Sequence, residues 1–428
     1  MRLRHVFPSL LFAGLSALAA AEPAVQPAVE AGGLALKPGD HVAVIGDSIT
    51  EQKLYSRFIE VYLLASSGVA DLDVAQFGWS GERAPSWVTR GAKSTEWFKP
   101  TVATTCYGMN DGSYKAYTDD IGKTYHDATV AYTDQMKKAG VRELVIGSPG
   151  AVDTTTWKKD PGPAVYNVNL EKLGSIGHDI AKEKGVRSAD VHGPMLATMA
   201  KAKAAYGDAY HVAGPDGVHP DQNGHLLMAG AFLAALGCDG EIARITIKAD
   251  GSAEATAGHT VVKAGDNAVE LSSTRWPFVL TGDGKSTGST RSIAPYTDFV
   301  EKLDRFILVV PDCAWGKATI TWGEQKATVD GAQLKAGVNL LTLFTVTPFD
   351  QASEALSRAV AAQQDLETLL VKQLICNPAR GALDGDAASK ELFQKLIDRQ
   401  VELRGDKVKA VRAALKPVTY RIAVAKAE

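Results

Sequence analysis

The chain has 428 residues, with 46 Lys and Arg against 49 Asp and Glu, and a formal net charge of -3. It contains no basic run and no basic amphipathic helix, so we expect neither nucleic acid nor an anionic membrane surface as a partner. The sequence does not indicate an oligomeric state. Because the length exceeds that of one ordinary domain, we expect more than one structural unit.

The first 21 residues are typical of a secretory signal peptide. Arg2 and Arg4 supply positive charge, residues 6–18 are mostly apolar, and the alanines at 19–21 offer a cleavage site. The apolar run is too short for a stable membrane span. We therefore predict a secreted or periplasmic protein in which residues 22–36 form a leader. Loss of the two arginines would lower the net charge from -3 to -5.

Four widely separated cysteines give little indication of cross-linking. They are Cys106, Cys238, Cys313 and Cys376. Their spacing matches no metal pattern and no dense disulfide framework. One long-range disulfide is compatible with export, but we expect mostly buried free thiols.

Short apolar runs alternate with helical patterns before residue 240. The predicted strands are 42–45, 72–77, 102–107, 143–147 and 186–191, and the predicted helices include 119–138 and 167–184. This alternation is typical of a parallel sheet covered by helices on both faces. We therefore predict an α/β domain over residues 37–240.

The pattern changes after Gly240. Short runs rich in β-branched residues, such as ARITIKA and KATITW, predict an antiparallel β module over residues 241–428. Two long helical patterns, 349–375 and 387–415, are separated by the turn formers Asn377, Pro378 and Gly381. They predict an αα-hairpin over about 349–415.

The last apolar run of the chain and three tryptophans are further features of the region after Gly240. Residues 418–425, VTYRIAVA, predict a strand that returns to the β module. The tryptophans are Trp276, Trp315 and Trp322. We interpret them as core residues, with sugar-binding platforms as the alternative. The hairpin could also mediate self-association.

Ser48 stands where the first predicted strand meets a helix, in HVAVIGDSITEQ. The helical pattern carries Leu54, Phe58, Val61 and Leu64 on one face. Open α/β sheets place their ligands at such strand ends, so Ser48 is a candidate nucleophile and Asp47 a candidate substrate-binding neighbour. The alternative is a capping box, in which Ser48 and Glu51 only satisfy amides of the first helical turn.

Asp216 and His219 form a candidate acid-base unit in AGPDGVHPDQNGH. Their spacing lets the carboxylate reach Nδ1 of the imidazole, which would leave Nε2 to take a proton from a hydroxyl. A plain surface turn is one alternative. A metal site that also uses His211 and His225 is another, although the spacing matches no recognised zinc pattern.

Two further strand ends offer hydrogen-bond donors for an oxyanion. Gly78 in QFGWSGE has no Cβ, so its backbone N–H could approach a ligand closely. Asn110 in CYGMNDG could present its side-chain amide. Together with the amide of Ser48, these groups would form a three-donor pocket at one edge of the sheet. Either residue could instead belong to an ordinary turn.

Several side chains near these segments are candidate substrate-binding residues. They are Trp79, Arg83, Tyr107, Met109 and Trp157, with Trp87 and Tyr166 close to them in sequence. Exposed aromatic rings beside an arginine suit stacking on sugars, whereas burial in the core is the alternative for each ring.

The segments IGDSIT, FGWSGE, GMND and DGVH resemble, in this order, the four sequence blocks of the SGNH hydrolases, also called the GDSL esterase and lipase family. The resemblance covers about residues 37–240. It implies a three-layer α/β/α fold similar to flavodoxin, with a five-stranded parallel sheet in the order 2-1-3-4-5.

The resemblance also implies site roles. Ser48 would be the nucleophile, His219 the base and Asp216 its orienting partner. The amides of Ser48 and Gly78 and the side chain of Asn110 would form the oxyanion hole. The chain departs from the family in its second block, where Gln76 and Phe77 precede the glycine and an asparagine is common.

These features predict an exported serine esterase that needs no cofactor and removes a small acyl group, acetyl, from a carbohydrate. Its substrate would be a small-molecule or polysaccharide ester. No broad apolar stretch near the four blocks resembles a lipid-binding lid. One alternative is an O-acyltransferase acting on envelope polysaccharide, but the sequence offers no membrane-spanning donor segment. Another is a non-catalytic polysaccharide-binding protein, which retention of all four blocks disfavours.

Overall fold

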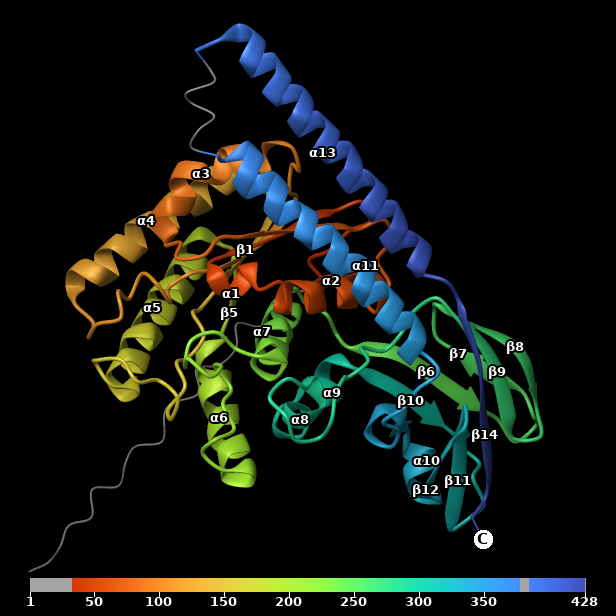
Figure 1. Ribbon diagram of the computed structural model, residues 1–428. Coiled ribbons are helices and arrows are strands. Elements are labelled where there is room, and N and C mark those ends of the chain that lie inside the picture. The colour runs from red at the N-terminus through yellow and green to blue at the C-terminus, as the bar shows by residue number, and fades with distance from the viewer. Residues whose placement is uncertain (1–32, 378–384, 428) are drawn as a thin grey trace, which may run out of the picture.

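The computed structural model describes residues 33–377 and 385–427, and Figure 1 shows their arrangement. The predicted signal peptide, residues 22–32 of the predicted leader, Pro378 and Gly381 lie outside the described residues.

A five-stranded parallel sheet forms the centre of the N-terminal region. Its strands are β1 (His41–Gly46), β2 (Asp73–Gly78), β3 (Val102–Cys106), β4 (Glu143–Gly147) and β5 (Arg187–Ala189). The order β2-β1-β3-β4-β5 confirms the predicted topology. In β1, Val42 and Val44 face one hydrophobic cluster while Ala43 and Ile45 face another. Burial on both faces explains why residues 42–45 of this strand are all apolar.

Helices cover both faces of this sheet (Figure 1). They are α1 (Ser48–Glu51), α2 (Tyr55–Ala65), α3 (Ala84–Glu96), α4 (Asp119–Lys138), α5 (Pro163–Lys184), α6 (His192–Tyr206) and α7 (Gln222–Ala235). Helices α2 and α7 pack together on one face, and α3 and α5 flank α4 on the other. The α/β/α prediction is confirmed. The single helix predicted after Ser48 is divided, because Lys53 has a φ of 57° and ends the first turn.

The C-terminal region contains two further sheets, one of four strands and one of five. Their strands are β6 (Glu241–Ile247), β7 (Ala253–Ala255), β8 (His259–Gly265), β9 (Ala268–Ser273), β10 (Arg305–Val309), β11 (Lys317–Trp322), β12 (Gln325–Asp330), β13 (Val338–Asn339) and β14 (Val418–Lys426). The orders are β13-β10-β6-β7 and β12-β11-β14-β9-β8, so β14 returns to the module as predicted. The predicted antiparallel pairing is found throughout the five-stranded sheet and at the pairs β10–β13 and β6–β7, whereas β6 and β10 differ from the prediction and pair in parallel. The long connection between them brings the chain back in the same direction.

Helices complete the C-terminal region. They are α8 (Thr290–Ile293), α9 (Phe299–Leu303), α10 (Gly331–Ala336), α11 (Asp350–Leu369), which continues as a π-helical turn (Leu370–Ile375), and α13 (Ala387–Ala414). Helices α11 and α13 pack along each other, which confirms the predicted hairpin. Figure 1 shows the hairpin lying across the N-terminal region beside α1 and α2. Trp276 and Trp322 are buried, as expected for core residues, and Trp315 is half-buried.

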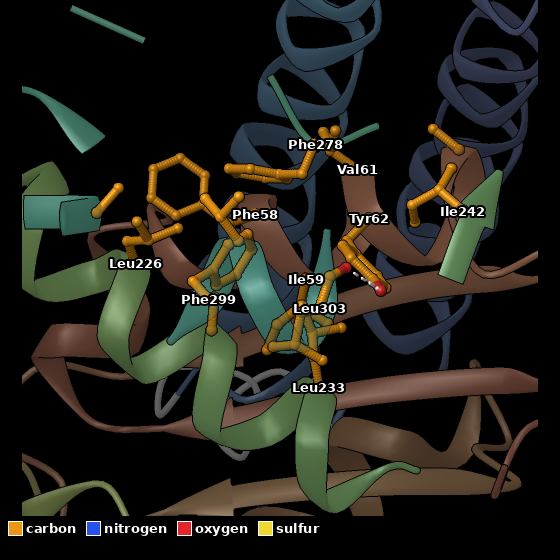
Figure 2. Packing of buried hydrophobic residues seen from close by; sticks show 14 of the residues in the cluster. Phe58, Ile59, Val61, Tyr62, Leu226, Leu233, Ile242, Phe278, Phe299 and Leu303 are labelled. Carbon is orange, nitrogen blue, oxygen red and sulfur yellow. Dashed lines mark hydrogen bonds between the residues drawn. The ribbon is translucent and has the colours of Figure 1, made fainter. Parts of the chain in front are cut away.

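A large hydrophobic cluster connects the two regions. Figure 2 shows Phe58 and Ile59 of α2 beside Phe299 and Leu303 of α9. The hydroxyl of Tyr62 donates a hydrogen bond of 2.7 Å to the carbonyl oxygen of Leu303. The domain boundary near residue 240 stays a prediction, but the burial of apolar side chains is continuous across it.

The cysteine prediction is confirmed. All four cysteines are free thiols, with Cys106 and Cys313 buried and the others partly buried. Within residues 33–377 and 385–427, no helix combines the length and the apolar character needed to cross a membrane.

Candidate active site

Three side chains form a continuous hydrogen-bonded chain at the carboxyl edge of the central sheet. Ser48 opens α1 directly after β1, and Asp216 and His219 lie in the loop that precedes α7. Nε2 of His219 is 2.8 Å from Oγ of Ser48, and Nδ1 is 2.7 Å from Oδ2 of Asp216. With the proton on Nδ1, Nε2 accepts from the Ser48 hydroxyl. This is the arrangement of a nucleophile, its base and an orienting carboxylate.

Both oxygens of the Asp216 carboxylate are hydrogen-bonded within the loop, Oδ2 to His219 and Oδ1 to two backbone amides. Oδ1 accepts hydrogen bonds of 2.9 Å from the amides of Val218 and His219. Burial raises the pKa of Asp216, but the bonds from the His219 side chain and these two amides outweigh it and hold the pKa below its ordinary value of 3.8. Gly217 has a φ of 81°, and a Cβ there would lie 2.7 Å from the backbone of Trp157. The tight turn therefore presents an ionised carboxylate to His219.

The capping-box interpretation of Ser48 is wrong. The N-cap of α1 is Asp47, whose Oδ1 accepts a 3.0 Å hydrogen bond from the amide of Ile49. Ser48 is the first residue inside the helix, and its hydroxyl faces His219 instead of a backbone amide. The carboxylate of Glu51 accepts from Ser80, outside the helix. The hydroxyl of Ser48 is therefore available for chemistry.

Asn110 lies between the turn of Ser48 and the loop after β2. Its Nδ2 donates to the carbonyl oxygen of Glu82 at 3.0 Å and to Oδ2 of Asp47 at 3.3 Å. Its Oδ1 accepts a 2.8 Å hydrogen bond from the hydroxyl of Tyr114. Because the amide oxygen faces the tyrosine, the NH2 group faces Glu82 and Asp47, the residue before Ser48. Tyr114 was not predicted from the sequence, in which its signal is the spacing of four residues after Asn110.

Asp47 is a buried carboxyl group and does not offer an open substrate contact. Burial raises its pKa to about 7, and the carboxyl groups of Asp111 and Glu82 add to this rise despite the hydrogen bond from the amide of Ile49. The Asn110 amide is its other hydrogen-bond partner. The predicted role of Asp47 in substrate binding is therefore replaced by a role in shaping the turn.

The amide of Gly78 is already engaged. It donates a 2.9 Å hydrogen bond to Oε1 of Gln76, the residue at which the second block departs from the family. A Cβ on Gly78 would lie 2.2 Å from the backbone nitrogen of Glu51, so glycine here permits close packing of β2 against α1. Gly81 differs from Gly78 in its surroundings. It is exposed, it has a φ of 75°, and a Cβ added to it would meet open space. The Ser-Gly pair in FGWSGE was the signal for it.

The loop between β2 and α3 is anchored by a buried ion pair. Glu82 accepts hydrogen bonds from Nε and Nη2 of Arg90 at 2.5 and 2.6 Å and from the hydroxyl of Tyr107 at 2.6 Å. Nη2 of Arg90 also donates to the carbonyl oxygen of Phe77. Tyr107, predicted to bind substrate, therefore lies in the support of this loop.

Most of the other predicted substrate-binding residues also lie in the interior. Met109 and Trp157 are at most 3% exposed, and Trp87 and Tyr166 are equally buried. Trp157 stacks on Tyr166 with ring centroids 5.3 Å apart. Only Arg83 is exposed, and Trp79 is half-buried. The aromatic residues near the site thus act mainly in packing.

The residues proposed for a metal site do not converge. His225 is buried, and its Nδ1 accepts a 3.2 Å hydrogen bond from the amide of Tyr55. His211 faces Asp221 at 3.7 Å instead of Asp216. Within the part of the chain that the structure describes, no group of three His, Cys, Asp or Glu side chains is arranged to hold a metal ion.

The chain is similar to known proteins in sequence profile and in fold. Residues 44–227 match the sequence profile of the GDSL-like lipase/acylhydrolase family. No curated protein matches the chain in sequence. A gut microbial diltiazem-metabolizing enzyme is similar in structure over 92% of this chain and 98% of its own, with 22% identity and a TM-score of 0.70, which shows a shared fold across both regions. An acetylxylan esterase from Geobacillus stearothermophilus aligns with 48% of this chain and 97% of its own, at 19% identity and a TM-score of 0.40.

Proposed function

Because residues 44–227 match the sequence profile of the GDSL-like lipase/acylhydrolase family, we propose that this chain is a serine esterase that removes an acetyl group from a carbohydrate. The observation that carries the proposal is the hydrogen-bonded chain from Asp216 through His219 to Ser48. It joins a hydroxyl, a base and an ionised carboxylate in the order that acyl transfer requires.

The proposed reaction has two halves. His219 takes the proton of Ser48 while Oγ attacks the ester carbonyl carbon, and the carbonyl oxygen becomes an oxyanion. His219 then gives the proton to the departing alcohol oxygen, which leaves acetyl on Ser48. In the second half, His219 deprotonates a water molecule that attacks the acetyl group. As the bond between the acetyl carbon and Oγ breaks, His219 returns the proton to Oγ, and acetate leaves.

Three donors are assigned to the oxyanion. The first is the amide of Ser48 at the start of α1, where the first-turn amides of a helix have no partner within it. The second is Nδ2 of Asn110, whose 3.3 Å contact with Asp47 is the longer of its two hydrogen bonds and the one to be exchanged for the oxyanion. We assign the third to Gly81 in place of Gly78, because the Gly78 amide is engaged by Gln76. Such donors are each worth about 3 kcal/mol in the transition state.

Two features support a polar alcohol as the leaving group. Arg83 is exposed and is the N-cap residue of α3, directly after Glu82. A shallow hollow lined by the polar residues Thr154, Thr155, Thr156, Lys158 and Asp208 reaches Pro215, which precedes Asp216. Hydroxyl and charged side chains of this kind suit a hydroxyl-rich molecule. The predicted signal peptide supports export, and we propose that the enzyme meets its substrate outside the cytoplasm.

The test is acetate release by the purified protein from acetylated oligosaccharides and polysaccharides, with p-nitrophenyl acetate as a general ester. Diltiazem forms a separate arm, because the enzyme with the similar two-part fold is described as metabolizing it. Ser48→Ala is the inactive variant, and Ser86→Ala, at an exposed position of α3, is the matched control.

Release that depends on Ser48 and is fastest on a glycan supports the proposal. Release from diltiazem alone would support the proposed esterase activity but would show that the substrate is not a carbohydrate. Transfer of acetyl to an added sugar in preference to water would establish a transferase, and glycan binding without turnover of any ester would establish a binding protein.

A further inference from the structure

Glu51 connects the helix of Ser48 with the loop that follows β2. It is the last residue of α1, the four-residue helix that Ser48 begins. Its Oε2 accepts hydrogen bonds from the amide and the hydroxyl of Ser80, at 2.5 and 2.6 Å. Ser80 directly precedes Gly81, so this carboxylate sets the distance between the proposed nucleophile and one proposed oxyanion donor.

The other oxygen of Glu51 is held from the distant C-terminal half. Nζ of Lys372, 321 residues further along the chain, donates to Oε1 at 2.6 Å. Both side chains are about one-fifth exposed, at 20% for Lys372 and 19% for Glu51. Burial raises the pKa of Glu51, but the bonds from Lys372 and Ser80 outweigh it and keep the pKa below its ordinary value. The carboxylate is thus a charged bridge between two elements.

Lys372 also holds the same loop at a second point. Its ammonium lies 5.1 Å from the ring centroid of Trp79, and the guanidinium of Arg90 lies 4.9 Å from that centroid. Cations at such distances attract an indole ring. Trp79 and Ser80, the two residues before Gly81, therefore both depend on Lys372.

The position of Lys372 is itself fixed by the hairpin. Lys372 lies in the π-helical turn that extends α11, and such turns are frequent at functional sites. In the helical turns before Lys372, α11 is hydrogen-bonded to the edge strand β2. Gln363 donates to the carbonyl oxygen of Val74, and Glu367 accepts from the amide of Gln76. Arg404 of α13 bonds to Glu367 in turn. The hairpin is thus bonded to the edge strand that leads into this loop.

We propose that Lys372 is a positioning residue of the active site, which holds Ser80 and the Gly81 amide in place through Glu51. The C-terminal hairpin would then be a working part of the esterase and not an appended module. This inference rests on the proposed function, since its kinetic consequence requires turnover of an ester.

Four variants test the relay. Lys372→Met removes the charge and keeps an unbranched side chain over Trp79, and Lys372→Arg restores a cation. Glu51→Gln, alone and combined with Lys372→Met, completes a double-mutant cycle. Asp365→Asn is the matched control, because Asp365 of α11 pairs at 3.1 Å with Lys53 beside α1 but makes no contact with Glu51 or Ser80.

With p-nitrophenyl acetate as substrate, we expect Lys372→Met to lower kcat by about 10-fold to 100-fold and to change KM by less than about twofold. The reason is that a displaced oxyanion donor affects the transition state more than substrate binding. Lys372→Arg should recover most of the loss, Asp365→Asn should match the wild type, and Lys372→Met should cost little more when Glu51→Gln is present. An unchanged kcat, a loss equal in the Asp365→Asn control, or independent losses in the double variant would overturn the proposal.

Hydrogen–deuterium exchange of the peptide covering residues 76–83 separates this inference from the proposed function. We expect faster exchange in Lys372→Met than in the wild type and in Asp365→Asn, and equal exchange in all three would overturn the relay. A wild-type protein that hydrolyses no ester would refute the proposed function, whereas the exchange result would still decide whether Lys372 holds the loop.

Discussion

Nε2 of His219 lies 2.8 Å from Oγ of Ser48, although 171 residues separate them in the sequence. The two meet because β1 ends at the edge of the sheet where the loop before α7 also passes. The imidazole is fixed from behind by Asp216, at 2.7 Å from Nδ1. This short chain of contacts makes the role of each member separately testable.

We expect Asp216→Asn to lower kcat by roughly 10³-fold to 10⁴-fold, because an amide in this place favours the wrong tautomer of His219 and does not stabilise its cation. KM should change little. The measurement is steady-state hydrolysis of p-nitrophenyl acetate. Asp179→Asn, an exposed change on α5, is the control and should match the wild type. A loss of less than about tenfold would mean that Asp216 is not the orienting carboxylate.

Tyr114→Phe should lower kcat by about tenfold without unfolding the protein. The hydroxyl of Tyr114 donates to Oδ1 of Asn110, and its loss would leave the Asn110 amide without the bond that sets its orientation. Tyr117→Phe removes a hydroxyl from the same loop and serves as the control. The comparison of kcat with the melting temperature separates a loss of catalysis from a loss of stability. Equal kcat values in both variants would show that Tyr114 acts in packing alone.

The burial of Asp47 predicts a pH-dependent stability. Its pKa is about 7 in the folded protein against an ordinary value of 3.8, so the folded state binds more protons than the unfolded chain between these values. Stability from this group is complete below about pH 4 and is lost as the pH rises through about 7. Relative to the wild type, Asp47→Asn should therefore gain in free energy of unfolding from about pH 5 to about pH 8. Urea unfolding of both proteins at the two pH values measures this, and a constant difference would contradict the raised pKa.

Phe299→Ala should lower the free energy of unfolding by about 3–5 kcal/mol, because the ring is 3% exposed and its removal leaves a cavity beside α2. Since the hydrophobic cluster joins the two regions, we expect one unfolding transition that shifts as a whole. Val262→Ala, at an exposed position of β8, is the control. Loss of the C-terminal region alone, with esterase activity kept through the transition, would show that the two regions unfold independently.

Much of the N-terminal fold could be predicted because its signals are local. Apolar runs mark the strands, and burial of the parallel sheet on both faces requires residues 42–45 of β1 to be apolar without interruption. The spacing of Asp216 and His219 places base and carboxylate in one turn. The order of the four blocks along the chain also assigns Ser48 and Asn110 to neighbouring strand ends.

Contacts between distant segments could not be predicted in this way. Nothing local shows that Gln363 of α11 donates to the carbonyl oxygen of Val74 in β2, or that β6 and β10 run in parallel. Both depend on how the chain is packed against itself.

The residues that would react with substrate are thus determined by the sequence, through spacing within a turn and position after a strand. The residues that hold them are decided by the tertiary structure: Tyr114 by the path of its loop, and Lys372 by the docking of the hairpin on β2. The physical reason is the distance along the chain over which each kind of interaction acts. Turn geometry and periodicity act over a few residues, whereas a buried ion pair forms only when packing brings its two ends within hydrogen-bond distance.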